Sequence, residues 1–129
     1  MKKNILKIKL PKGLKYAAIG AKRSDHKIKV GAALVNKKNV IIAWNRVRTS
    51  PAALKHGYRW ADQSHAEFNL FSHTLGPTNT SGTVFVYREL QDGRLATAKP
   101  CKYCREFLRS IGVKSICYTI YDSYVKEKL

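Results

Sequence analysis

Two short motifs, each at the expected start of a helix, constrain this chain more than any other feature of its sequence. The first is His65-Ala66-Glu67 and the second is Pro100-Cys101-Lys102-Tyr103-Cys104. Together they supply an imidazole, two thiols three residues apart, and a carboxylate two residues beyond the imidazole. Two thiolates and one imidazole can hold zinc with a fourth position left for water, and a nearby carboxylate can move that water's protons. A fold that uses both motifs must bring the two helix starts side by side.

Size and composition predict one globular domain. The chain has 129 residues and 44% hydrophobic content, enough to bury one core but not two. No apolar run is long enough to cross a bilayer, and lysines interrupt the apolar residues near the N-terminus, so we expect a cytoplasmic protein without a membrane partner. Three cysteines, two of them in a Cys-x-x-Cys pair, favour a metal over a disulfide framework. The expected domain is 1–129, with 1–11 as a short strand or a flexible basic arm.

The first half of the chain shows one helical pattern and then two strand patterns. Apolar residues bracketed by lysines predict an amphipathic helix from Leu14 to Ala21. Two apolar, β-branched runs, Ile28 to Val35 and Val40 to Trp44, predict antiparallel strands because a polar connection of hairpin length joins them. From Asn45 to Ser64 the pattern breaks, and we expect a long loop.

The second half alternates helices with strands. The spacing of apolar residues predicts helices from His65 to Leu75 and from Cys101 to Ile111, the second ended by Gly112. Strands are expected at 83–87 and 115–120. A strand, a helix and a strand in succession form a parallel crossover, so the fold class is α/β, with a mixed sheet covered by helices.

Charge is the second strong constraint. The chain carries 25 Lys and Arg residues against 8 Asp and Glu residues, a formal net charge of +17. Such an excess attracts polyanions, whose phosphates release counterions on binding. Nucleic acid is therefore the expected partner, and a nucleotide is the smaller alternative.

The expected loop after Asn45 interleaves cations with aromatic residues. Phosphates need positive charge and unpaired bases need flat apolar surfaces, so single-stranded nucleic acid favours such a segment. A plain solvated loop is the alternative reading. The candidate nucleic-acid contacts are Arg46, Arg48, Lys55, Arg59 and Trp60.

The remaining cysteine and histidines receive structural interpretations. Cys117 lies in an apolar strand pattern, where a small buried thiol is ordinary core material. The alternative is a closed zinc site in which Cys117 and His65 complete four ligands with the Cys-x-x-Cys pair. His26, His56 and His73 are expected on the surface or in loops. The Trp44 side chain is expected to pack against other residues of the protein.

These motifs resemble the zinc signature of the cytidine deaminase superfamily, H-x-E followed by P-C-x-x-C. The resemblance extends to the strand pair 29–35 and 42–45, and to the segment 111–114 before the last predicted strand. It implies a single-domain, three-layer α/β/α cytidine-deaminase-like fold, with an antiparallel first hairpin and helices that carry the zinc ligands. Relatives often assemble, so an oligomer is an open expectation.

The resemblance also implies roles for individual residues. His65, Cys101 and Cys104 would bind Zn²⁺, and Glu67 would be the catalytic proton shuttle while water displaces the ring's exocyclic amine as ammonia. Asn45 would contact the substrate's sugar or base. The backbone at Ala66 and Cys101 would meet the edge of the base.

The remaining hypotheses about function differ mainly in the substrate. Charge favours cytosine within single-stranded DNA or RNA, deaminated to uracil. A free-nucleotide deaminase, acting on deoxycytidylate or cytidine, needs only one phosphate site. A tRNA adenosine deaminase is a third reading, since 30–32 and Trp44-Asn45 are similar to that group. A non-catalytic zinc module that binds nucleic acid is the alternative of another class, and Glu67 argues against it.

Overall fold

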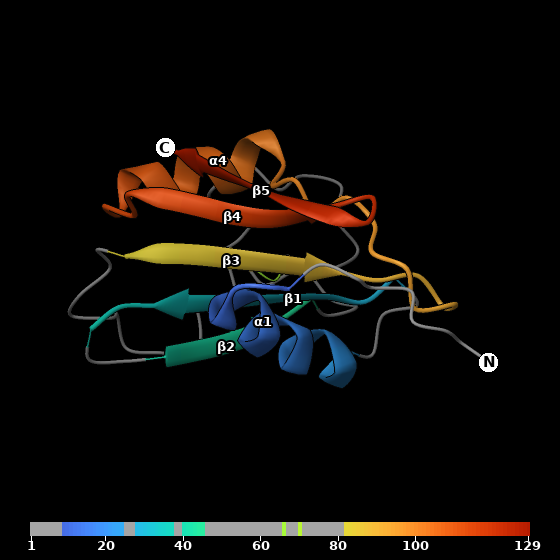
Figure 1. The fold of residues 1–129 in the computed structure, drawn as a ribbon. Helices are drawn as coiled ribbons and strands as arrows, with labels where there is room; N and C mark the ends of the chain where they lie inside the picture. The colour runs from blue at the N-terminus through green and yellow to red at the C-terminus, as the bar shows by residue number, and fades with distance from the viewer. Residues whose placement is uncertain (1–8, 25–27, 38–39, 46–65, 67–69, 71–81) are drawn as a thin grey trace.

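The computed structural model of the protein describes residues 9–24, 28–37, 40–45, 66, 70 and 82–129. The strands of this part form one mixed sheet of five, in the order β2-β1-β3-β4-β5 (Figure 1). β1 pairs antiparallel with β2 and β3, β3 pairs parallel with β4, and β4 pairs antiparallel with β5. The strands are β1 (Val30–Val35), β2 (Val40–Trp44), β3 (Thr83–Arg88), β4 (Ser115–Ile120) and β5 (Ser123–Lys128). The predicted first hairpin and the predicted parallel crossover are both confirmed.

Helices lie on both faces of the sheet. α1 (Lys12–Arg23) packs on β1, β2 and β3 and contributes to one buried cluster, while α4 (Lys102–Ser110) contributes to the other (Figure 1). Ala66 and Leu70, both helical, belong to the α4 cluster. The fold is α/β with helical layers on both faces, as predicted.

Side-chain alternation along the strands divides the core in two. In β4, Ile116 and Tyr118 point to the α4 cluster, whereas Cys117 between them belongs to the α1 cluster. β1 divides in the same way, with Ala32 on the α4 side and Ala33 on the α1 side. Each central strand therefore buries both faces, which is why these strands read as continuous apolar runs.

Close contact between α1 and β1 depends on a glycine. A Cβ atom on Gly31 would lie 1.8 Å from the carbonyl oxygen of Ala17 and 2.3 Å from the backbone nitrogen of Ala21. Both atoms are α1 backbone and cannot rotate away as a side chain could. The absence of a side chain at this position thus lets α1 lie directly on the sheet.

Most predicted elements are confirmed with small shifts at their ends. α1 extends the predicted helix by two residues at each end, and α4 begins one residue later than predicted because Cys101 is its N-cap. Gly112, with φ of 96°, ends α4 as predicted. β1 begins at Val30 and not at Ile28, because Ile28 is 45% exposed and its carbonyl accepts a hydrogen bond from a side chain.

β5 was not predicted. It alternates half-buried with exposed residues, and its sequence SYVKEK contains lysine and glutamate, which are uncommon in strands. It nevertheless pairs with β4 along its whole length.

Several predictions fall on residues that the structure does not describe. The expected loop after Asn45 lies outside the described residues, as does the expected helix from His65 to Leu75 except for Ala66 and Leu70. Among the described residues, no helix is both long and apolar enough to cross a membrane.

Candidate metal centre

Cys101 and Cys104 lie together at the start of α4. Cys101 is the N-cap, and its Sγ accepts the backbone N–H of Cys104 at 3.5 Å. Cys101 is half-buried and Cys104 is fully buried. A sulfur atom that accepts an N–H at a helix N-terminus is stabilised as the thiolate, the form that binds metal. The i and i+3 spacing lets both side chains project from one side of the helix start, and their role as ligands stays a prediction.

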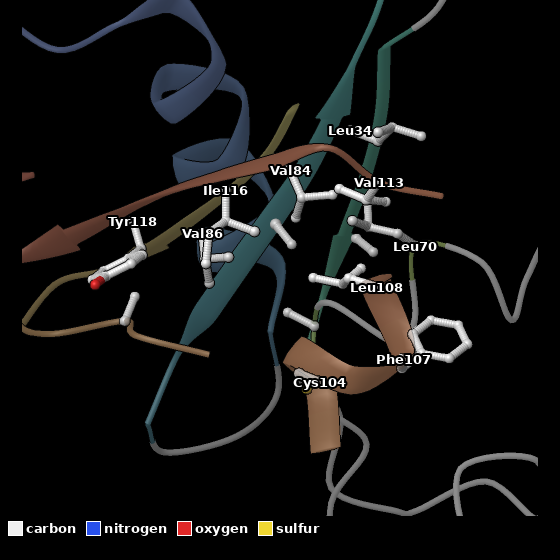
Figure 2. Close-up of a cluster of buried hydrophobic side chains, with 14 residues drawn as sticks. Leu34, Leu70, Val84, Val86, Cys104, Phe107, Leu108, Val113, Ile116 and Tyr118 are labelled. Atoms are coloured by element: carbon white, nitrogen blue, oxygen red, sulfur yellow. The ribbon is translucent and has the colours of Figure 1, made fainter. Parts of the chain in front are cut away.

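The two motifs converge on the same part of the core. Ala66, the central residue of the first motif, is buried in the cluster that contains Cys104, and Cys101 packs against this cluster. Leu70, one helical turn after Ala66, is a member too, and Figure 2 shows it close to Leu108 and Val113. The structure therefore places the middle of His-x-Glu in the same buried cluster as Cys104. His65 and Glu67 themselves lie outside the described residues.

A buried threonine fixes the chain that leads into α4. The Thr119 side-chain oxygen donates to the carbonyl of Ala96 at 2.8 Å and accepts the N–H of Arg88 at 3.1 Å. The Thr119 carbonyl accepts the N–H of Ala98 at 2.9 Å. The connection from β3 to α4 is thus bonded to the end of β4 three residues before Cys101. These bonds hold the first turn of α4, residues 101–104, in place relative to the sheet. This turn is called the metal turn below.

A second network ties α4 itself to β4 and β5. Arg105 Nη1 donates to Glu127 Oε1 at 3.0 Å, and the Tyr118 hydroxyl donates to Glu127 Oε2 at 2.7 Å. These hydrogen bonds, Tyr118 first and then Arg105, hold the pKa of Glu127 below its usual range. Burial, together with Glu127, raises the pKa of Tyr118. The sequence analysis missed this network because Glu127 lies in the strand that it did not predict.

Cys117 does not join the two cysteines of α4. It is 1% exposed and lies in the α1 cluster, whereas Cys104 lies in the α4 cluster on the other side of the sheet. Burial raises the pKa of the Cys117 thiol to about 11, although Lys126 acts in the opposite direction. The core interpretation of Cys117 is therefore confirmed, and the closed site completed by Cys117 is excluded.

Asn45, a predicted substrate contact, directly follows β2 and is buried. Its Oδ1 accepts the hydroxyl of Ser24 and, at 3.0 Å, the N–H of Val30, and its Nδ2 donates to the carbonyl of Ile28 at 2.6 Å. The amide thus joins the end of α1 to the start of β1. This structural role is an addition to the sequence analysis, and contact with the substrate stays a prediction.

The tryptophan beside Asn45 packs as expected. Trp44 is half-buried, and the guanidinium carbon of Arg23 lies 5.7 Å from the centre of its ring. A cation at that distance from an aromatic face is a stabilising contact. The contact ties the last turn of α1 to the edge strand β2.

The surface around the metal turn is basic and partly aromatic, which the sequence analysis did not single out. Lys99 and Lys102 are exposed on either side of Cys101, and Tyr103 is 37% exposed between the two cysteines. The signal was present in the sequence, since both lysines and the tyrosine lie within or beside the motif. The predicted contacts Arg46, Arg48, Lys55, Arg59 and Trp60 lie outside the described residues.

A cavity of about 680 Å³ opens where β1 begins and β3 ends, the sheet end from which the chain proceeds to α4. It has three cationic side chains, and the acidic side chains in its wall are engaged elsewhere: Glu89 with the Tyr87 hydroxyl and Asp92 with Arg94. The cysteines of α4 do not line it. Among the described residues, the lining is Ala21, Lys22, Ile28, Lys29, Arg88, Glu89, Leu90, Gln91 and Asp92.

Comparison with known families decides the identity of this arrangement. The family model for the cytidine and deoxycytidylate deaminase zinc-binding region matches residues 9–120. The chain belongs to this deaminase family. The match covers α1, all of the sheet except β5, and α4 with its two cysteines. No curated protein matches the chain. Family membership supports zinc-dependent deamination as the general chemistry and zinc as the metal.

The two cysteines at the start of α4 are suitable zinc ligands, because zinc in proteins is commonly bound by thiolate sulfur. Cys101 and Cys104 form no disulfide and lie together at the first turn of α4. No group of three or more histidine, cysteine, aspartate or glutamate side chains gathers within the described residues. Two of the three predicted ligands fall within that part, and the third lies outside it. His65 stays the predicted ligand.

Proposed function

We propose that this deaminase converts cytosine to uracil within single-stranded DNA or RNA, and that residues 1–129 form one zinc-dependent deaminase domain. The observation that carries the proposal is the position of Ala66 in the same buried cluster as Cys104, which supports joining the two motifs in one site. The family match supports the reaction class. The substrate class is argued from charge.

The charge argument starts from the surface of the metal turn. Lys99 and Lys102 are exposed beside Cys101, and Tyr103 presents part of an aromatic ring to solvent. The described residues contain two ion pairs, Arg94 with Asp92 and Arg105 with Glu127, so most cations in this part of the chain form no ion pair within it. Exposed cations beside an aromatic ring suit a phosphodiester strand, which needs several phosphate contacts. A free nucleotide needs one.

Each catalytic residue has a distinct task in the proposal. His65, Cys101 and Cys104 hold the metal. When bound, zinc lowers the pKa of a coordinated water and so supplies a nucleophile at neutral pH. Glu67 takes one proton from the attacking water and delivers it to the ring nitrogen, then takes the second proton from the hydroxyl left on the ring carbon and delivers it to the departing amine. Cytosine and water become uracil and ammonia, and Glu67 ends the cycle in its starting form.

The role of Glu67 can be tested with a matched control. We expect Glu67→Ala to retain zinc and to release ammonia at least about a hundred-fold more slowly, since general acid–base catalysis contributes about that much or more. Glu106→Ala, which removes an exposed carboxylate from α4, should leave ammonia release unchanged. Equal turnover in the Glu67→Ala variant and the parent protein would exclude the mechanism.

The substrate is tested by comparing carriers of cytosine under one set of conditions. Single-stranded DNA, single-stranded RNA and the free monophosphates are incubated with the enzyme, and uracil formation is measured at two salt concentrations. We expect turnover on at least one oligonucleotide, with affinity that falls steeply as salt rises. Turnover on monophosphates with none on oligonucleotides would overturn the polynucleotide proposal, and inosine formation in tRNA would favour the adenosine reading.

A further inference from the structure

Arg105 is bonded both to the metal turn and to the far edge of the sheet. Its backbone N–H donates to the carbonyl of Cys101 at 2.9 Å, and its Cα follows that of Cys104 directly. Its side chain reaches Glu127 on β5. One residue thus connects the turn that carries both thiols to a strand that lies beyond the matched family region.

The other partner of this contact is held equally firmly. Each carboxylate oxygen of Glu127 has its own donor, Arg105 for Oε1 and Tyr118 for Oε2. The side chains of Arg105 and Glu127 are 26% and 32% exposed, so the pair is partly shielded from water. By contrast, Arg94 and Asp92, which are two residues apart in one turn, are more than half exposed. The Arg105–Glu127 pair therefore joins distant elements, whereas the Arg94–Asp92 pair closes a local turn.

The two cysteines need this connection to different degrees. Cys104 is fully buried among core side chains, so packing alone fixes it (Figure 2). Cys101 is the half-buried N-cap and lies outside the buried set. The Thr119 bonds hold the chain three residues before Cys101, and the Arg105 side chain holds the helix just after Cys104. If the second of these anchors is lost, the first turn of α4 can rotate about Cys104 and carry Cys101 away from a shared ion. Metal ligands require their geometry to be held to within a few tenths of an ångström.

We propose that Glu127 is a positioning residue for the metal centre, which fixes the first turn of α4 through Arg105 so that Cys101 and Cys104 face one ion. Glu127 itself touches neither the ion nor the substrate. The proposal depends on the zinc chemistry of the family and not on the polynucleotide substrate. It gives β5 a function in the site.

The first test compares two carboxylates in ion pairs. Glu127→Gln and Asp92→Asn each remove one charge from an arginine pair while they retain the size of the side chain. Zinc affinity is measured by competition with a chromophoric chelator, and the cobalt-loaded proteins are compared by absorption spectroscopy. We expect Glu127→Gln to bind zinc about ten-fold more weakly and to shift the cobalt spectrum, as for other residues that orient metal ligands. Asp92→Asn should match the parent protein in both.

A second variant guards against a general loss of folding. Tyr118→Phe removes only the hydroxyl that donates to Glu127 and leaves the ring in the core. It should weaken zinc binding in the same direction, but by less. Because Arg105 and Glu127 act through one contact, the double variant Arg105→Gln with Glu127→Gln should lose no more zinc affinity than the single variants.

One pattern of results would overturn the proposal. If Glu127→Gln and Tyr118→Phe lower the melting temperature but keep the zinc affinity and cobalt spectrum of Asp92→Asn, the network merely stabilises the fold. Since no nucleic acid enters these measurements, their outcome is independent of the substrate test. A deaminase specific for free nucleotides would leave this inference intact.

Discussion

The Sγ of Cys101 accepts the backbone N–H of Cys104 across the first turn of α4. Both sulfur atoms thus lie at one helix N-terminus, where the helix dipole favours negative charge. The sulfur atom of the third cysteine, Cys117, is buried on the opposite face of the sheet. The three cysteines should therefore differ sharply in what their removal does.

We expect Cys101→Ala and Cys104→Ala to lose bound zinc, and Cys117→Ala to retain it. The first two remove thiolate ligands, whereas Cys117→Ala removes only a buried sulfur and should cost about 1 kcal/mol of unfolding free energy. Zinc content after dialysis, measured by atomic absorption, separates the two groups. Loss of zinc from Cys117→Ala under conditions where it stays folded would contradict the assignment.

Thiol labelling gives a second readout of Cys117. With a pKa of about 11, its thiolate fraction at pH 8 is about one in a thousand, and its side chain is 1% exposed. We expect iodoacetamide to leave Cys117 unmodified in the folded protein and to modify it in guanidinium chloride. Mass spectrometry of the digested protein identifies the labelled positions.

Much of the fold follows from local patterns in the sequence. The β1–β2 hairpin and the β3–α4–β4 crossover are predictable because each central strand is a short apolar run between turn residues. The same local pattern does not predict β5, because Lys126 and Lys128 are exposed and only alternate residues are partly buried. Pairing with β4, a contact between elements, defines this strand more than its own composition does.

The metal turn was predictable, but its supports were not. Cys101 and Cys104 are recognisable by spacing alone, because i and i+3 on a helix fix a common direction. Thr119 and Glu127 hold that turn through contacts with residues 23 and 22 positions away in the chain. No local pattern encodes such pairs.

We expect the Asn45 side chain to contribute to the stability of the fold. In Asn45→Ala, the N–H of Val30 and the carbonyl of Ile28 both lose a buried partner. We expect a loss of about 2 kcal/mol or more in unfolding free energy, measured by urea denaturation. Ser24→Ala removes a single hydroxyl donor to the same amide and should cost less.

Kinetics of the same two variants address the predicted substrate contact. Well below the melting temperature of both, a KM that rises in Asn45→Ala and stays constant in Ser24→Ala would support contact between the amide and the substrate. Equal KM values would assign Asn45 to the fold alone.

Acid should abolish the contribution of Glu127 to stability. Its pKa is lowered in the folded protein, by Tyr118 first and then by Arg105, so the folded state favours the carboxylate. A group with a lowered folded pKa stabilises the fold above its ordinary pKa, here 4.5, and loses that effect as the pH falls through the folded value. In metal-free protein, we expect the melting temperatures of the parent chain and Glu127→Gln to differ by a constant amount from neutral pH to about pH 5 and to converge below pH 4.5. A difference that persists unchanged to about pH 2 would mean that the charge of Glu127 does not act through Tyr118 and Arg105.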